Sequence, residues 1–169
     1  GGWDGIWYQR LAVYGYDPTV AHGNGVAFSP LYPVLVRVTG NALGWSYLVA
    51  GIAVSTVAFL VAIVLLHRLI ERRMGERVAR TAVWLIAFFP VAYLFSSVYT
   101  ESVFLLLTVL TFVLLERGWS TGASVVGSLA VLARPTGILL VPSLAWRIWK
   151  DAGRRPSWRL VPILLLPAA

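Results

Sequence analysis

Three ionisable side chains that could do chemistry stand out in an otherwise apolar sequence: Asp4, Glu101 and Arg134. A carboxylate can take a proton from an attacking hydroxyl, and a planar, permanently charged guanidinium is suited to binding phosphate. Charged groups within or near hydrocarbon are costly, and those that occur there are functional by default. A general base together with a phosphate-binding cation indicates group transfer from a lipid-linked phosphate donor.

Asp4 lies among aromatic residues in the stretch Trp3-Asp4-Gly5-Ile6-Trp7-Tyr8. Read as a helix, this part of the chain has one stripe of large apolar residues, Trp3, Trp7, Leu11 and Tyr14. Asp4 and Tyr8 lie at the edge of the stripe. Large amphipathic rings favour the membrane interface, so the helix is predicted to lie there, with Asp4 at the mouth of the space that the membrane helices enclose. The alternative for Asp4 is an N-cap or a solvated carboxylate.

The composition is that of an integral membrane protein. Of 169 residues, 59% are hydrophobic and 12% are charged, about half the charged share of a soluble globular domain. The net charge of +7 comes from 13 Arg and one Lys, which cluster between apolar runs as in cytoplasmic loops and do not form a nucleic-acid groove. The absence of Cys excludes disulfides and thiolate metal sites, and His22 and His67 lack the spacing of metal ligands.

The apolar runs predict an all-α, polytopic membrane protein in which residues 1–169 form a single, partial transmembrane domain. The predicted membrane helices cover 45–66, 81–100, 103–115, 119–133 and 137–149, and 160–169 begins a further one. The first has about 22 residues and would span roughly 33 Å. Pro90 predicts a kink in the second.

Residues 1–44 are predicted to form a long external loop that carries interfacial helices. Pro30 and Pro33 predict an elbow here, because two prolines three residues apart disfavour a regular helix across 29–33. The chain starts on Gly1 without an initiator Met and stops within an apolar run, so we expect it to be a fragment of a longer protein.

Charge distribution predicts the orientation. Basic clusters at 67–80 and 150–159 are typical of cytoplasmic loops, which places the N-terminal loop, Glu101 and Arg134 on the external side. Several runs have only about 13 to 15 residues, fewer than the roughly 20 needed to cross the hydrocarbon. Such helices leave their ends in a protein-lined or water-filled cavity. We therefore expect Glu101 and Arg134 to lie in a cavity on the same face as Asp4.

A structural role is the alternative for Glu101 and Arg134, which could form an ion pair or extend to the interface. Arg134 is predicted at a helix break on the external side, beside Pro135 and Gly137. Cations usually gather on the cytoplasmic side, so an external Arg favours a functional role. Two carboxylates on one face could also hold a divalent metal ion. No feature of the sequence requires a metal or another cofactor.

Five stretches occur in a characteristic order, Trp3-Asp4-Gly5-Ile6-Trp7-Tyr8, Ala12-Val13-Tyr14-Gly15-Tyr16, Ala27-Phe28-Ser29-Pro30-Leu31-Tyr32-Pro33, Tyr99-Thr100-Glu101-Ser102-Val103-Phe104 and Ala133-Arg134-Pro135-Thr136-Gly137. In this order they resemble the PIG-V-type (GPI mannosyltransferase II-like) family. The resemblance spans most of residues 3–137. Ser29 stands where the family's elbow usually has Phe, and Asp17 and His22 match its acidic or histidine-containing step only loosely.

The resemblance implies a GT-C glycosyltransferase, a polytopic helical enzyme that moves mannose or another hexose from a polyprenyl-phosphate donor to a lipid or glycan acceptor with inversion. It implies that Asp4 is the base, that Glu101 orients substrate hydroxyls, and that Arg134 stabilises the departing phosphate. The aromatic residues that could contact the sugar are Trp3, Tyr8, Tyr32 and Tyr99. Anchoring in the lipid headgroups is the commoner role of interfacial rings.

Two other classes share part of the pattern, namely a transporter or lipid flippase, and a non-catalytic membrane subunit. Transporters place their charges near the midplane and often show a duplicated half, whereas here the charges gather on one face without a visible repeat. The expected partners are membrane lipids, the lipid-linked donor and the acceptor, with no nucleic acid. The excess of Arg over Lys hints at a GC-rich bacterial source and hence the plasma membrane; the endoplasmic reticulum membrane is the eukaryotic alternative.

Overall fold

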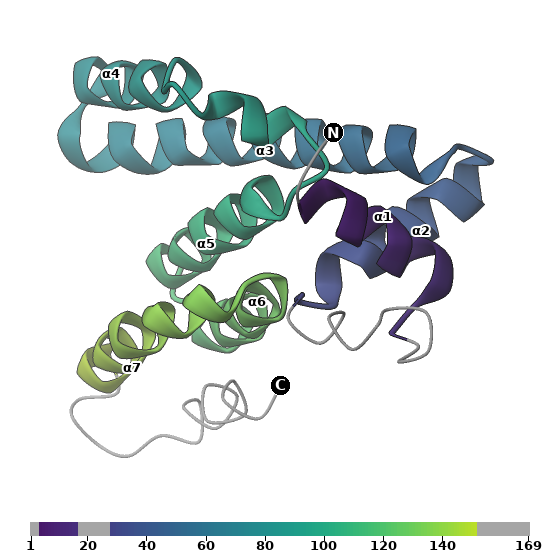
Figure 1. The fold of residues 1–169 in the computed structure, drawn as a ribbon. Coiled ribbons are helices and arrows are strands. Elements are labelled where there is room, and N and C mark those ends of the chain that lie inside the picture. Colours follow the sequence, from purple (N-terminus) through teal and green to yellow (C-terminus); the bar gives the residue numbers. More distant parts are fainter. Residues whose placement is uncertain (1–3, 17–27, 152–169) are drawn as a thin grey trace.

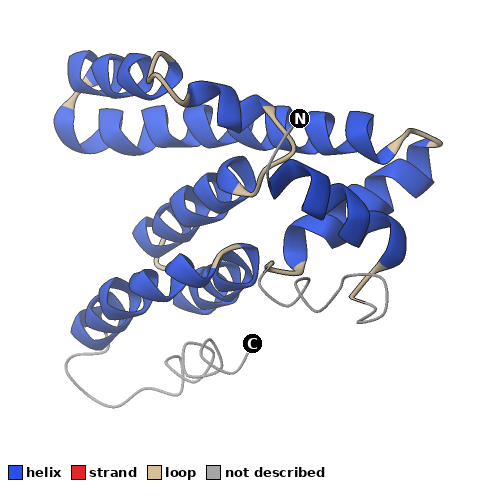
Figure 2. Cartoon of the chain, in the orientation of Figure 1, coloured by secondary structure: helices blue, strands red, loops and turns tan. Residues whose placement is uncertain are grey.

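A computed structural model describes residues 4–16 and 28–151, and within them all regular structure is helical (Figures 1 and 2). The elements in chain order are α1 Asp4–Tyr14, α2 Leu31–Leu43, α3 Tyr47–Met74, α4 Glu76–Ala87, the 3-10 helix η2 Ala92–Ser96, α5 Glu101–Glu116, α6 Ser120–Ala133, the 3-10 helix η3 Pro135–Leu139, and α7 Leu140–Asp151. The all-α class predicted from the sequence is confirmed. The predicted helix start at 160–169 lies outside the described residues.

The longest element is α3, whose 28 residues give it a length of roughly 42 Å. It is the one helix in the described part of the chain that is both long and apolar enough to cross a membrane. Only 28% of its most apolar 18 residues are buried, so most of that stretch is left to face its surroundings. The apolar helix α6 is shorter, with 14 residues.

Residues 67–80, predicted as a cytoplasmic loop, are helical and form the ends of two helices. α3 continues to Met74, α4 begins at Glu76, and Gly75 alone makes the turn with a φ of 87°. Such a positive φ is readily adopted by glycine. Glu76 and Arg80 pair across one turn of α4, which shows how alternating charges are accommodated on a helix as well as in a loop. The two helices then run back side by side (Figure 1).

The single kinked helix predicted over 81–100 is also not observed. α4 ends at Ala87, and the chain then turns through Pro90 into the 3-10 helix Ala92–Ser96. Proline has no N–H to donate and its ring clashes with the preceding turn, so the helix stops before Pro90 instead of bending around it. This irregular segment returns the chain along α3 and delivers it to the start of α5.

The N-terminal loop contains two helices, and α2 begins earlier than the prolines predicted. It starts at Leu31, inside the predicted elbow, with Pro33 in its first turn. The N–H groups of a first turn have no partner within the helix, so a proline is tolerated there. α2 buries Tyr32 and Val36 completely, and it ends at Leu43, just before Gly44, whose φ is 66°.

The buried face of α1 differs from the predicted stripe. The residues that α1 buries are Gly5, Tyr8, Leu11 and Ala12. Tyr14, predicted on the apolar stripe, is 58% exposed, and Trp3 lies outside the described residues. The buried face of α1 is therefore rotated toward Tyr8 relative to the predicted stripe. Contact with α2 and α3, and not the size of the aromatic rings, determines which residues of α1 are buried.

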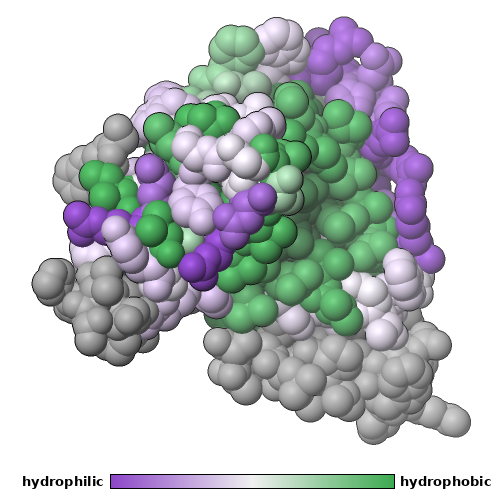
Figure 3. Space-filling model, turned by 90° about the vertical axis from the view of Figure 1, so that its right-hand side faces the viewer, coloured by the Kyte–Doolittle hydropathy of each residue, from purple (hydrophilic) through white to green (hydrophobic). Residues whose placement is uncertain are grey.

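Packing places α5 between α3 and α6 (Figure 1). Along α3 the buried residues are small ones, Ala50, Gly51, Ser55, Ala58 and Ala62. Small side chains allow helix backbones to approach closely, as is common within membranes. One apolar cluster joins α1, α2, α3 and α5, and a second joins α5, α6 and α7. A band of apolar residues runs through the right half of the face shown in Figure 3, with hydrophilic residues along its right-hand edge and a mixture of both kinds to its left.

Candidate functional site

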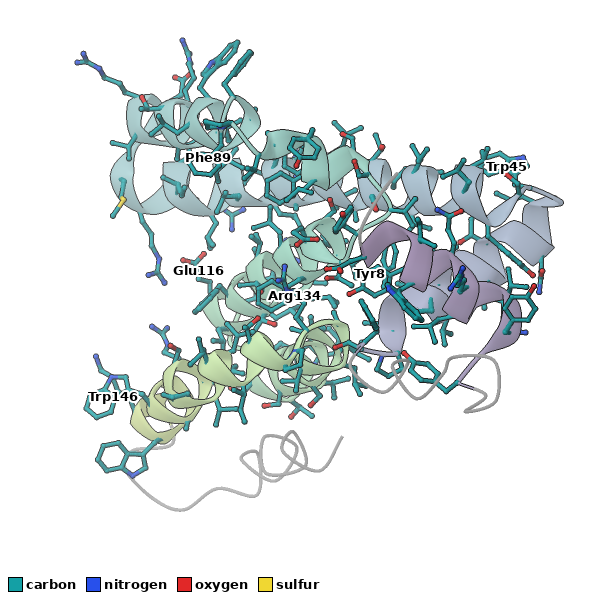
Figure 4. The ribbon with its side chains drawn as sticks, viewed as in Figure 1. Tyr8, Trp45, Phe89, Glu116, Arg134 and Trp146 are labelled. Atoms are coloured by element: carbon teal, nitrogen blue, oxygen red, sulfur yellow. The ribbon has the colours of Figure 1, made fainter. Side chains whose placement is uncertain are left out.

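Arg134 and Glu101 form an ion pair between the end of α6 and the start of α5, with 2.7 Å between Nη1 and Oε1. Glu101 is the first residue of α5, and Arg134 follows the last residue of α6 in an extended conformation. Their side chains are 23% and 37% exposed, so the pair lies partly below the surface. The ion pair that the sequence left open as a structural alternative is thus present. Figure 4 shows Arg134 in the middle of the molecule, with Tyr8 to one side of it.

The second carboxylate oxygen of Glu101, Oε2, is buried and has no hydrogen-bond partner among the described residues. A buried acceptor of this kind is unfavourable unless a donor meets it. Arg134 satisfies only one of the two oxygens. Chemically, the carboxylate is therefore able to accept a further hydrogen bond from a hydroxyl that enters the site.

Tyr8 on α1 lies within electrostatic range of Asp4, Glu101 and Arg134. Its hydroxyl shares a hydrogen bond with the side chain of Thr100, and the charges of Asp4, Glu101 and Arg134 all act on it. Burial is the main cause that raises the pKa of Tyr8, and the two carboxylates raise it further, whereas Thr100 and Arg134 lower it. The three ionisable residues singled out in the sequence are therefore all near enough to Tyr8 to influence the pKa of its hydroxyl.

Asp4 is the first residue of α1 and is exposed. Within residues 4–16 and 28–151 its carboxylate makes no hydrogen bond or ion pair. Its position is set by Gly5, because a Cβ there would lie 3.3 Å from the carbonyl oxygen of Val98 and 3.7 Å from the ring of Tyr99. The Tyr99 hydroxyl also meets the backbone of Gly5. The start of α1 thus rests on the segment that leads into Glu101.

An aromatic cluster holds α1 on α2. The Tyr8 ring meets the rings of Phe28 and Tyr32 edge-on, with centroids 5.2 and 5.3 Å away, and Trp7 stacks on Phe28 at 6.0 Å. Tyr32 is fully buried and its hydroxyl bonds within the protein, so the structure corrects its predicted contact with a sugar. Tyr99 is half-buried beside Asp4.

Several residues of the predicted pattern cannot be placed. Trp3, Asp17 and His22 lie outside the described residues. In the part of the chain that is described, no three carboxylate or imidazole side chains gather where a metal ion could bind.

Sequence reasoning missed Thr100 and Ser55. Thr100 is 3% exposed and lies beside Glu101, and Ser55 is fully buried within α3. A signal was present for Ser55, because a hydroxyl in the middle of a long apolar run needs a partner. No such signal marked Thr100, whose partner comes from α1.

An apolar cavity of about 550 Å³ lies between α2, α3, α5 and α6. Its lining includes Leu31, Leu35, Ala58, Val103, Leu107 and Leu129. It contains none of the ionisable site residues, so it suits an apolar chain and not the chemistry itself. Val103 lines the cavity two residues after Glu101 and packs in the same apolar cluster as Tyr8. The cavity therefore begins close to the polar site.

Comparison with known proteins agrees with the geometry. A family model described as Mannosyltransferase (PIG-V) matches residues 1–151, which include Asp4, Glu101, Arg134 and every described helix. No curated protein matches the chain, and no solved structure does. The match covers far more than half of the sequence and contains all of the elements that build the site. The chain therefore belongs to the mannosyltransferase (PIG-V) family, a family of membrane glycosyltransferases.

Proposed function

We propose that this chain is the N-terminal part of a membrane mannosyltransferase. It transfers mannose from a polyprenyl-phosphate donor to a hydroxyl of a lipid or glycan acceptor on the external face of the membrane. The observation that carries the proposal is the Arg134–Glu101 ion pair, which has one carboxylate oxygen unpartnered and lies next to the segment on which the start of α1, with Asp4, rests. Family membership supports the class of reaction.

In the proposed reaction Asp4 accepts the proton of the acceptor hydroxyl. The acceptor oxygen then attacks the anomeric carbon and forms the new glycosidic bond, while the bond from that carbon to the phosphate oxygen breaks. Attack opposite to the leaving group inverts the anomeric configuration. The electron pair leaves with the polyprenyl phosphate, whose growing negative charge must be stabilised.

Arg134 is the proposed partner of that phosphate. A guanidinium has five N–H donors in a fixed fork, and the ion pair with Glu101 uses the Nη1 side. The remaining donors are available to phosphate oxygens. The unpartnered Oε2 of Glu101 would accept a hydrogen bond from a hydroxyl of the sugar or the acceptor. Glu101 thus has two proposed tasks, to hold Arg134 and to orient substrate.

The apolar cavity beside Val103 is the proposed place for part of a lipid chain. A chain lying there would reach the polar site at the start of α5, where phosphate and sugar are needed. The proposed membrane anchor is α3, the one described helix that is long and apolar enough to cross a membrane. The proposed location is the plasma membrane for a bacterial source and the endoplasmic reticulum membrane for a eukaryotic one. The proposed reaction has no step that needs a cofactor.

The test is Asp4→Asn in the full-length protein, assayed for transfer of radiolabelled mannose from a polyprenyl-phosphate donor. Loss of a general base lowers the rate by about 100-fold or more. Glu76→Gln is the matched control, since Glu76 is also an exposed carboxylate at the first residue of a helix. Transfer at the wild-type rate by a well-expressed Asp4→Asn protein would remove Asp4 as the base.

A further inference from the structure

A chain of buried hydroxyls crosses the core beneath the site. The Tyr32 hydroxyl of α2 lies 2.8 Å from Oγ of Ser55 on α3, and that Oγ donates to the carbonyl oxygen of Tyr99 at 3.3 Å. Tyr32 and Ser55 are both fully buried. The three residues come from parts of the chain that are far apart in sequence, so their hydrogen bonds join α2, α3 and the segment before α5.

The number of hydroxyl protons determines which group donates and which accepts in each of these hydrogen bonds. Tyr32 and Ser55 supply one hydroxyl proton each, whereas three acceptors lie within reach, because the Tyr32 hydroxyl is also 3.1 Å from the carbonyl oxygen of Gly51. That carbonyl belongs to α3 and already accepts the helical hydrogen bond from the residue four positions later. The arrangement that satisfies most groups has Tyr32 donating to Ser55, and Ser55 donating to Tyr99.

The approach that makes these bonds depends on Gly51. A Cβ at this position would lie 2.9 Å from a methyl carbon of Val98 and 3.4 Å from the Tyr32 hydroxyl. With no side chain at Gly51, Tyr32 and the segment before α5 can both lie against α3. Apolar residues surround the chain of hydroxyls, so water does not compete for these bonds.

The end of this chain is two residues from Glu101. Tyr99 provides the carbonyl that Ser55 holds, and the next residue, Thr100, is the partner of Tyr8. On the other side of Glu101, Ser102 donates to the carbonyl oxygen of Phe95 at 2.6 Å. Hydrogen bonds thus hold the start of α5 on both sides of Glu101. Of these two bonds, the one from Ser55 to Tyr99 comes from α3, and the one from Ser102 goes to Phe95.

We propose that Ser55, assisted by Tyr32, is a positioning residue of the transferase. It holds the carbonyl of Tyr99 on α3 and so sets where Glu101 meets Arg134 and where Thr100 meets Tyr8. Neither Ser55 nor Tyr32 touches substrate. This inference rests on the proposed function for its kinetic part, and on the contacts alone for its structural part.

The kinetic test compares Ser55→Ala with Ser124→Ala in the full-length enzyme. Ser124 is an equally buried serine, but its hydroxyl donates to Ser120 within its own helix. We expect Ser55→Ala to lower kcat about tenfold at nearly unchanged KM, because a displaced catalytic group slows chemistry more than binding. Ser124→Ala should leave both constants close to wild type. Equal kcat values for the two variants would overturn the proposal.

Tyr32→Phe provides a second variant that keeps the ring in the aromatic cluster. Ser55 can still donate to Tyr99 without the Tyr32 hydroxyl, so we expect a smaller loss of kcat, about threefold. The double variant should be no slower than Ser55→Ala, because both changes act on the same chain of bonds. If Ser55→Ala does not fold, Tyr32→Phe alone decides, and an unchanged kcat would then contradict the proposal.

Hydrogen–deuterium exchange tests the structural part without any activity assay. Ser55→Ala should speed exchange of the backbone amides in residues 97–104, and Ser124→Ala should not. Unchanged exchange in this segment would overturn the positioning role. If the wild-type protein transfers no mannose and yet shows the expected exchange, the proposed function fails while the positioning of Glu101 by Ser55 stands.

Discussion

Arg134 donates to Glu101 across 2.7 Å and thereby joins the end of α6 to the start of α5. The two residues are 33 positions apart in the sequence, and the chain between them consists mostly of these two helices. The pair is partly exposed, so solvent screens it. Its value lies less in stability than in geometry, because it keeps a phosphate-binding cation beside a carboxylate with one oxygen still unpartnered.

A double-mutant cycle on this pair should reveal its coupling. We expect Glu101→Gln and Arg134→Gln each to lower the free energy of unfolding, and the double variant to lose about 1 kcal/mol less than the sum. Denaturant unfolding in detergent measures this. The exposed Glu76–Arg80 pair is the control, with an expected coupling of roughly 0.3–0.5 kcal/mol. Strict additivity at Glu101 and Arg134 would show that their contact contributes nothing.

Replacement of Arg134 by Lys should separate charge from geometry. Lysine keeps the positive charge but lacks the planar fork that can hold Glu101 and a phosphate together. We expect Arg134→Lys to transfer mannose roughly 10- to 100-fold more slowly while remaining folded. Steady-state kinetics with the polyprenyl-phosphate donor measures the effect. A fully active Arg134→Lys enzyme would mean that a point charge is enough.

The pH dependence of Tyr8→Phe follows from the raised pKa of the Tyr8 hydroxyl. Burial and the neighbouring carboxylates keep the pKa above its ordinary value, so the hydroxyl stays protonated and acts as a hydrogen-bond donor. We expect Tyr8→Phe to lower kcat by the same factor at every pH between about 6 and 9, since no titrating group is removed in that range. A change in the shape of the pH–rate profile would indicate that Tyr8 itself titrates.

Gly137→Ala should destabilise the turn that follows Arg134. A Cβ at Gly137 would lie 2.7 Å from the backbone of Ala130 and Val131 in α6, and backbone atoms cannot move aside. The expected loss is about 2 kcal/mol or more in the free energy of unfolding. Gly122→Ala is the control, because its Cβ would meet the ring of Trp119, which is 63% exposed and can turn away. Similar losses for both variants would contradict this explanation.

The raised pKa of Tyr16 predicts that the folded protein becomes less stable at alkaline pH. Tyr16 is 40% exposed, and its partial burial, with a smaller effect of Tyr8, raises its pKa to about 12. Between the unfolded value of about 10 and this value the folded state binds more protons, so the free energy of unfolding falls as the pH rises through that range. Tyr16→Phe should show a shallower fall. In a titration followed by phenolate absorbance, Tyr16→Phe should lack one tyrosine that ionises at high pH. An unchanged titration curve would show that Tyr16 is not that tyrosine.

Local patterns in the sequence predicted the helical class well and the helix ends less well. Apolar runs correctly indicated α3, α5 and α6, because burial or membrane contact requires long stretches of such residues. Hydropathy predicts a loop at 67–80 because these residues are charged. It carries no information on the packing of α3 against α4, in which these residues are helical. The prolines gave two wrong predictions. Pro33 was expected to prevent a helix but fits its first turn, and Pro90 was expected to kink a helix that in fact ends before it.

The sequence by itself determined that the chain is helical and apolar, and which few residues carry charge, because hydropathy and residue type are local properties. Asp4, Glu101 and Arg134 could be named from it for that reason. Only the tertiary structure decided that Glu101 and Arg134 touch, and that Ser55 reaches the segment before α5. These contacts join distant parts of the chain and depend on how closely α3, α5 and α6 pack. Packing of that kind is set by the small residues at each crossing, which no single stretch of sequence reveals.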